Sequence, residues 1–146
     1  MGVHKMKIYQ EFFYQFMLVY RPFENQLNAI LSRHQIQRAQ WTVLFYLAKF
    51  ESVTLVELSH YLGVEKPTTT RTVQRLQEQG YVEQMTSLDK REKRMRLTTS
   101  GEKVYHDIRL FVDQFEQEIL QGIKEEELTG SIDVLKQIRT NLLKGE

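Results

Sequence analysis

The sequence predicts a mainly α-helical protein that carries one small β-hairpin. Over most of its 146 residues, apolar side chains recur every three or four positions, which is the period of amphipathic helices. Two prolines and seven glycines leave room for long helices. Between residues 81 and 97 the pattern changes to two short alternating runs around a charged turn, which is typical of two paired strands.

Composition limits the functions that the chain could have. It is 41% hydrophobic and 27% charged, with a net charge of +1, as in an ordinary globular protein. It has no cysteine, which excludes disulfides, thiolate metal sites and thiol nucleophiles. No apolar run is long enough to span a bilayer, and the N-terminus lacks the apolar region of a secretion signal. We therefore expect a cytoplasmic protein that does not enter the membrane.

Two helices are expected in the first third of the chain. The first, over residues 8–33, carries an apolar stripe rich in aromatic residues, and Pro22 is expected to kink or interrupt it near Tyr20. The second covers about residues 39–50. Residues 52–54 then predict a break in the regular structure.

Residues 54–80 predict a helix-turn-helix. Thr54 is suited to cap the first helix, because Glu57 three residues later can complete a capping box. Gly63 stands where a left-handed residue would end that helix, and Pro67 can begin the next helix without losing a hydrogen bond. Two helices joined by a short glycine-containing turn match this motif. They are placed at about residues 55–61 and 67–79.

The second of these helices has an outer face suited to DNA. Arginine can bond guanine through two hydrogen bonds, glutamine can bond adenine, and a threonine methyl can contact a thymine methyl. Threonine hydroxyls and helix N-termini also favour phosphates, and Thr54 is a further candidate for the DNA backbone. The alternative is an amphipathic surface helix with no ligand. The candidate DNA-contacting residues of this helix are Pro67, Thr68, Thr70, Arg71, Gln74 and Arg75.

The stretch from Leu88 to Gly101 predicts a projecting basic hairpin. Five Lys or Arg stand against two acidic residues, which favours a polyanionic partner, although a solvated turn is the alternative when the segment is taken alone. Asp89 can orient Arg91, whose planar guanidinium suits a narrow minor groove. A helix-turn-helix followed by such a hairpin is the layout of a winged helix-turn-helix domain. The residues expected to contact phosphates are Lys90, Lys93, Arg94 and Arg96.

These motifs together resemble the MarR (multiple antibiotic resistance regulator) family. The wing signature of that family is Asp-x-Arg, a short basic strand, and Leu-Thr-x-x-Gly, which is similar to Asp89-Lys90-Arg91, Leu97-Thr98 and Gly101. The stretch from Gln40 to Leu44 looks like its second helix, and Thr54 to Gly80 is similar to its helix-turn-helix, including the closing Leu76-x-x-x-Gly80-Tyr81-Val82. The resemblance covers nearly the whole chain in order and length.

The resemblance implies a triangular homodimer of winged-helix protomers that is not an enzyme. Residues 37–98 would bind DNA, and residues 1–36 and 99–146 would form the dimer interface. The alternative is that the apolar helices of these terminal segments pack on one another in a monomeric bundle. Two recognition helices would enter successive major grooves of a palindrome, with Arg91 in the minor groove and Asp89 orienting it. Members commonly repress transcription until a small aromatic molecule binds. Thr69, Thr72, Gln74 and Pro22 depart from the family's usual residues, and Thr69 and Thr72 predict looser packing of the recognition helix.

An effector pocket and two rival functions stay open. Aromatic residues near the pocket that the resemblance implies either form core and dimer packing or line an effector cavity. No histidine spacing or nucleotide-binding motif predicts a metal, cofactor or enzyme. A zinc-sensing site built from distant residues such as His34, His106 and nearby carboxylates stays an alternative. The rivals are a winged-helix protein-interaction module and a non-specific nucleic-acid binder. The candidate effector-pocket residues are Tyr14, Met17, Trp41 and Phe45.

Overall fold

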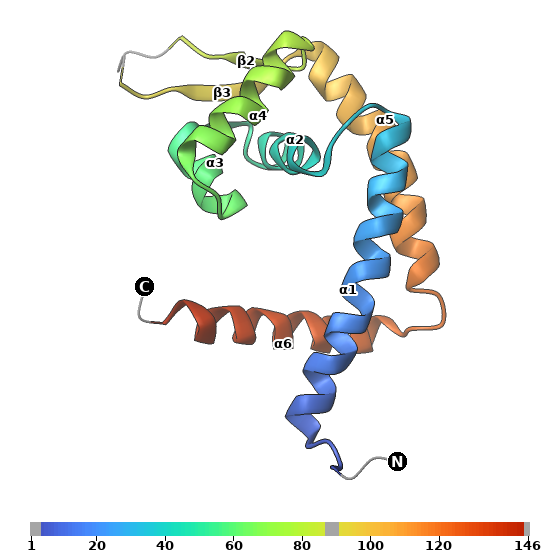
Figure 1. The fold of residues 1–146 in the computed structure, drawn as a ribbon. Coiled ribbons are helices and arrows are strands. Elements are labelled where there is room, and N and C mark those ends of the chain that lie inside the picture. The colour runs from blue at the N-terminus through green and yellow to red at the C-terminus, as the bar shows by residue number, and fades with distance from the viewer. Residues whose placement is uncertain (1–3, 87–90, 145–146) are drawn as a thin grey trace. The chain divides into compact units, whose positions relative to one another are not determined.

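The computed structural model describes residues 4–86 and 91–144 and confirms the predicted fold class, with a winged helix-turn-helix in the middle of the chain (Figure 1). The chain forms two compact units, residues 1–112 and residues 113–146. In order, the elements are α1 (Ile8–Arg33), α2 (Arg38–Phe50), β1 (Ser52–Thr54), α3 (Leu55–Leu62), α4 (Lys66–Glu78), β2 (Val82–Gln84), β3 (Arg94–Leu97), α5 (Thr99–Ile119) and α6 (Glu125–Leu143).

A three-stranded antiparallel sheet holds the hairpin against the helices. Its order is β1-β3-β2, so β3 is the central strand, and Met95 pairs with Val53 on one side and Gln84 on the other. The expectation of a break at residues 52–54 was therefore wrong, because these residues form β1. Three residues are too few to show an alternating pattern, and their partner strand lies about 40 positions later in the sequence.

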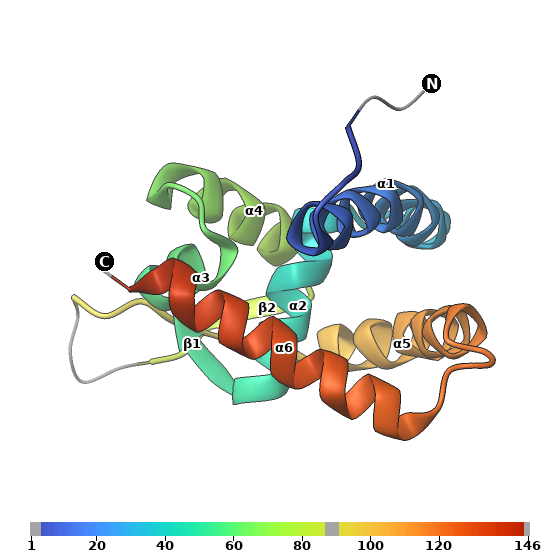
Figure 2. The ribbon, with the colours of Figure 1, turned by 90° about the horizontal axis from the view of Figure 1, so that it is seen from below.

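The elements α2 to β3 (Arg38–Leu97), here called the central lobe, share one apolar core. Helix α2 contacts α1, α3, α4, β1 and β3, and thus occupies the middle of the lobe (Figure 2). The largest side chains of the lobe that are completely or almost completely buried are Leu44, Leu47, Leu58, Leu76 and Met95. Thr69 of α4 is also fully buried, and its Oγ1 lies 2.9 Å from Oγ of Ser59 in α3. The hydrogen bond satisfies both hydroxyls, so the predicted looser packing is not found at Thr69.

Local capping signals place the helix ends where the sequence predicts them. The Thr54 hydroxyl accepts a hydrogen bond from the Glu57 backbone N–H at 3.1 Å, and Gly63 ends α3 with φ +67°. Thr98 caps α5, since its Oγ1 accepts from the Gly101 N–H at 3.0 Å. The predicted kink or interruption at Pro22 is not realised as a break, because α1 continues through it from Ile8 to Arg33.

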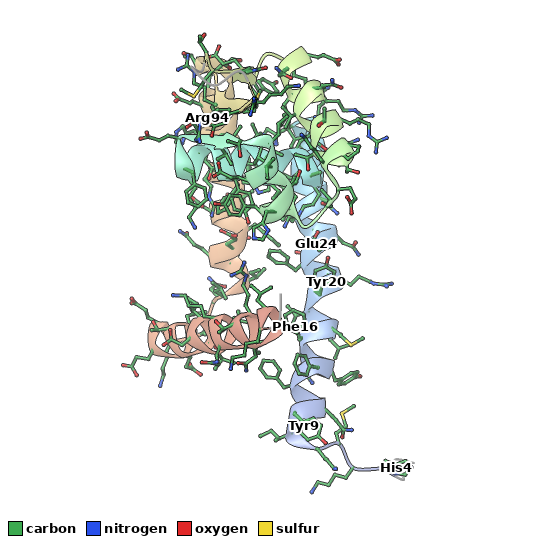
Figure 3. All side chains as sticks on the ribbon, turned by 90° about the vertical axis from the view of Figure 1, so that its left-hand side faces the viewer. His4, Tyr9, Phe16, Tyr20, Glu24 and Arg94 are labelled. Atoms are coloured by element: carbon green, nitrogen blue, oxygen red, sulfur yellow. The ribbon has the colours of Figure 1, made fainter. Side chains whose placement is uncertain are left out.

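The apolar stripe of α1 is longer than the part of it that is buried within residues 1–112. Its buried residues, Leu27 and Leu31, lie near its C-terminal end. Farther toward the N-terminus Tyr9, Phe16 and Tyr20 project from the helix with 58%, 51% and 59% of their surface exposed (Figure 3). In residues 4–86 and 91–144, no helix is both long and apolar enough to cross a membrane.

The second unit contains the end of α5 and all of α6. Phe115 is buried in α5, whereas no residue of α6 is buried. The apolar stripe of α6, here called its seam, is uncovered, because Ile132, Leu135 and Leu142 are 50%, 49% and 75% exposed. Such a helix has apolar surface available for a partner.

Candidate nucleic-acid interface

The recognition helix α4 turns one face to the core and the opposite face outward. Thr69, Val73 and Leu76 are buried, and this spacing defines its inner stripe. The helix begins with Lys66 and Pro67, as the proline signal predicts. On the outer face Pro67, Thr68, Arg71, Gln74 and Arg75 are exposed and Thr70 is half-buried. Their exposure leaves them accessible to a ligand, and their contact with DNA stays a prediction.

Polar side chains hold α4 at both ends. Near its N-terminus, Thr69 bonds Ser59 of α3. Near its C-terminus, the Gln40 amide donates to Oε1 of Gln79 at 3.0 Å, and Arg75 Nη1 donates to Oε1 of Gln37 at 3.3 Å. No sequence pattern marks Gln37, Gln40 or Gln79, because hydrogen bonds between residues almost 40 positions apart leave no local signal.

The structure describes the wing on both sides of residues 87–90. Arg91 and Lys93 are exposed and lie just before β3. Asp89 and Lys90 lie outside the described residues, so the expected pairing of Asp89 with Arg91 stays a prediction. The two strands that carry the tip extend away from α3 and α4 in Figure 1.

Arg94, which the sequence assigns to phosphates, makes several contacts within the lobe. Its Nη1 donates to the backbone oxygen of Ser52 at 3.3 Å and to its Oγ at 3.1 Å. Its Nη2 lies 3.0 Å from Glu92 and 3.7 Å from Glu57. The guanidinium thus joins β3 to β1 and to the first turn of α3. Two carboxylates beside it offset much of the charge that it could offer a phosphate.

Arg96 is paired in a similar way. Its Nε donates to Oε1 of Glu83 at 2.9 Å, and the two residues are directly opposite each other in the β2–β3 ladder. Both side chains are about half exposed, so the pair contributes little to stability. The two arginines of β3 therefore both have acidic partners.

A basic hollow of about 440 Å³ lies between the wing and the starts of α3 and α4. Three cations and one acid line it, so its charge favours an anion. Lys66 was not among the predicted site residues, although its place beside Pro67 at the start of the recognition helix could have identified it. The lining residues are Thr54, Leu55, Val56, Lys66, Arg91, Glu92 and Lys93.

A smaller hollow of about 240 Å³ lies on the α2 side of α4. It joins the predicted contacts Thr68, Arg71 and Arg75 to Gln37 and Gln40 of α2. The exposed face of α4 is therefore flanked on one side by the wing and on the other by the N-terminus of α2. The exposed face of α4, together with the two hollows beside it, is the candidate nucleic-acid interface.

The four candidate effector residues lie in two different environments. Trp41 is buried and stacks on Tyr105 of α5, with ring centroids 5.1 Å apart. Phe45 is half-buried and contacts Tyr46 edge-on. Tyr14 and Met17 of α1, by contrast, are 45% and 69% exposed. Their role in binding an effector stays a prediction. Within residues 4–86 and 91–144, no three His, Asp or Glu side chains are grouped to hold a metal ion.

The sequence is similar to a family model and to proteins named as transcriptional regulators. A family model described as MarR family matches residues 34–92, which span the lobe from the start of α2 to the wing. An uncharacterized HTH-type transcriptional regulator from Staphylococcus aureus is 36% identical over 138 residues, which covers 92% of this chain and 94% of the relative. YwoH of Bacillus subtilis, also an uncharacterized HTH-type transcriptional regulator, is 37% identical over 107 residues, or 73% of this chain and 78% of YwoH.

Solved structures agree with the sequence relatives. MarR from S. aureus, in complex with salicylate and kanamycin, is 35% identical and superposes with a TM-score of 0.85 over 95% of each chain. A mutant MarR from E. coli complexed with operator DNA is 28% identical, with a TM-score of 0.72 over 91% of this chain and 99% of that one. The wing, the helix-turn-helix and the long terminal helices thus recur together in proteins of similar length.

Proposed function

This chain belongs to the MarR family of transcriptional regulators, and we propose that it represses transcription by binding a palindromic operator as a homodimer. Its relatives are regulators of transcription and not enzymes. The observation that carries the proposal is the exposed face of α4, which presents Arg71, Gln74 and Arg75 beside the basic hollow of the wing.

The chemistry of this face suits a recognition helix in the major groove. Arg71 and Arg75 can each bond guanine, and Gln74 can bond adenine. Thr68 and Thr70 lie on the outer side of the first turns, where hydroxyls can bond phosphates or contact thymine methyls. The DNA complex of the E. coli MarR supports this assignment for a structurally similar chain.

The basic hollow is suited to the DNA backbone beside that groove. Lys66, Arg91 and Lys93 supply the charge, and Thr54 lines the same hollow at the start of α3. We assign Arg91 to the minor groove and Lys93 to phosphates. The roles expected of Asp89 and Lys90, which lie outside the described residues, stay predictions. Arg94 is assigned a weaker phosphate contact, because Glu92 and Glu57 lie within 3.0 and 3.7 Å of its guanidinium.

The uncovered apolar surfaces of α1 and α6 support a homodimer, which is typical of the family. A two-fold dimer would present two recognition helices to two half-sites about one helical turn apart. The salicylate complex of the S. aureus MarR supports a small aromatic effector here as well. An effector that binds the free dimer more tightly than the DNA-bound dimer would release the operator by linkage.

A random pool of duplex DNA provides the test. Selection with the full chain is expected to enrich a palindrome, and Arg91→Ala is expected to weaken binding to it about 10-fold, in the range for the loss of one groove contact. Arg21→Ala, which removes an exposed arginine from α1, has the same change in net charge and is expected to bind like the wild type.

Three outcomes would overturn parts of the proposal. Enrichment of no sequence, with affinity set by salt alone, would indicate a non-specific nucleic-acid binder. No binding of any duplex would favour a protein-interaction module. Equal losses in Arg91→Ala and Arg21→Ala would remove Arg91 from the interface and leave only a general effect of charge.

A further inference from the structure

Two glutamines at the N-terminal end of α2 are hydrogen-bonded to residues at the C-terminal end of the recognition helix. Gln37 immediately precedes α2, and Gln40 lies in its first turn. Their partners, Arg75 and Gln79, are four residues apart and therefore lie on one flank of α4, one turn from each other. Two hydrogen bonds thus join the same two helix ends side by side. The four residues are here called the glutamine clamp.

Gln40 is the buried member of the clamp. Only 4% of its surface is exposed, and both ends of its amide have partners. Its Oε1 accepts from the backbone N–H of Gln37 at 2.8 Å, and its Nε2 donates to Gln79 at 3.0 Å. If one of these hydrogen bonds broke, a buried polar group would be left without a partner, which costs free energy. The two hydrogen bonds therefore restrict how α2 and α4 can move relative to each other.

Gln37 connects the N-terminal end of α2 to Arg75, which lies on the exposed face of α4. Its backbone is held by Gln40, and its own Oε1 accepts from Nη1 of Arg75 at 3.3 Å. An arginine side chain has many rotamers, and a partner that restricts it reduces the entropy lost when it binds a base. Both residues line the smaller hollow on the α2 side of α4.

We infer that Gln37 and Gln40 are positioning residues for operator recognition: Gln40 sets the C-terminal end of α4, and Gln37 orients the guanidinium of Arg75. Neither glutamine needs to touch a base for this role. The inference rests on the proposed function, because it assigns to Arg75 a contact with the operator. It predicts that the effect of Gln37 on DNA binding passes through Arg75.

A double-mutant cycle on the selected operator measures that dependence. Gln37→Ala is expected to weaken binding about 3- to 10-fold when Arg75 is present, and less than about 2-fold when Arg75 is already alanine. Because both side chains are exposed, the melting temperature of each variant should remain close to that of the wild type. Gln77→Ala, on the opposite flank of the same helix, is the matched control and should bind like the wild type.

Sequence preference gives a readout that a purely structural role would not move. Relative to the wild type, Arg75→Ala should lose its base preference at one position of each half-site. Gln37→Ala should lose part of the preference at the same position. Gln40→Met, which keeps the length of the side chain without its amide, should weaken preference at the same position. Its melting temperature reports any loss of folding separately.

The outcomes separate this inference from the proposed function. Specific binding with equal losses from Gln37→Ala in both backgrounds would overturn the inference and leave the proposed function standing. A changed preference at a base pair that Arg75→Ala does not affect would also overturn it. Failure of the wild type to select any sequence would overturn the proposed function first, and the role of the clamp in recognition with it.

Discussion

The central lobe and the terminal helices contain similar apolar stripes, but the stripes are buried in the lobe and largely exposed on α1 and α6. Leu44, Leu58 and Leu76 of the lobe are completely buried. Ile8 of α1 and Leu142 of α6 are 88% and 75% exposed. Periodicity therefore identifies an apolar face without showing what covers it. In the lobe the faces of three short helices and a sheet meet within one chain, whereas the terminal faces require a further surface.

The largest expected effect comes from a cavity in the lobe. Leu44→Ala should lower the free energy of unfolding by about 2–5 kcal/mol, because the side chain is fully buried and its removal leaves a void. Leu142→Ala on α6 should change it by less than about 0.5 kcal/mol at low protein concentration, where a dimer contributes least. Urea unfolding of both variants measures the contrast. Similar losses would show that the exposed stripe is part of a core.

A pair of glycines sharpens the same comparison. In the first unit, a Cβ on Gly101 would collide with the backbone carbonyl of Tyr81, so Gly101→Ala should destabilise the protein by about 3 kcal/mol. Gly130 of α6 has open space around the position of a Cβ, and Gly130→Ala should stabilise the helix by about 0.5–1 kcal/mol. Thermal unfolding gives both signs. A gain of stability in Gly101→Ala would contradict the close contact between α5 and Tyr81.

A charge on the seam of α6 tests whether a second copy covers the terminal helices. Leu135→Asp should raise the dimer dissociation constant on the order of 10-fold or more, because an unpaired carboxylate would enter an apolar interface. Gln137→Asp adds the same charge two positions away from the seam residue and should have a smaller effect. Analytical ultracentrifugation measures both constants, and circular dichroism checks that the lobe stays folded. Equal dissociation constants for the two variants would exclude the seam from the interface.

The smallest effect concerns a strained junction within the lobe. Glu51 joins α2 to β1 with φ +64° and ψ −51°, a conformation that side-chain-bearing residues rarely adopt. Glu51→Gly should therefore raise the free energy of unfolding by about 1 kcal/mol. Glu65→Gly, at the extended N-cap of α4, is the control and should not stabilise the protein. A loss of stability in Glu51→Gly would mean that the glutamate side chain makes a contribution larger than the backbone strain.

Local signals explain why much of the fold could be predicted. The Thr54 cap, the Gly63 terminator and the Pro67 start each depend on residues within four positions, and the structure has all three. The exposed positions of α4 follow from its period in the same way. The MarR resemblance adds the order of these elements, which agrees with the relatives of known structure.

The sequence by itself therefore determined helices α1 to α4, the ends of α3, the start of α4, the basic hairpin and the outward residues of α4, because each is encoded by residues close together in the chain. The tertiary structure decided what residues far apart in sequence do together. Arg94 reaches Ser52 across 42 positions, and Gln40 reaches Gln79 across 39. Strand β1 exists only because β3 pairs with it. Such contacts depend on how separate elements meet in space, and no short-range period or cap records that meeting.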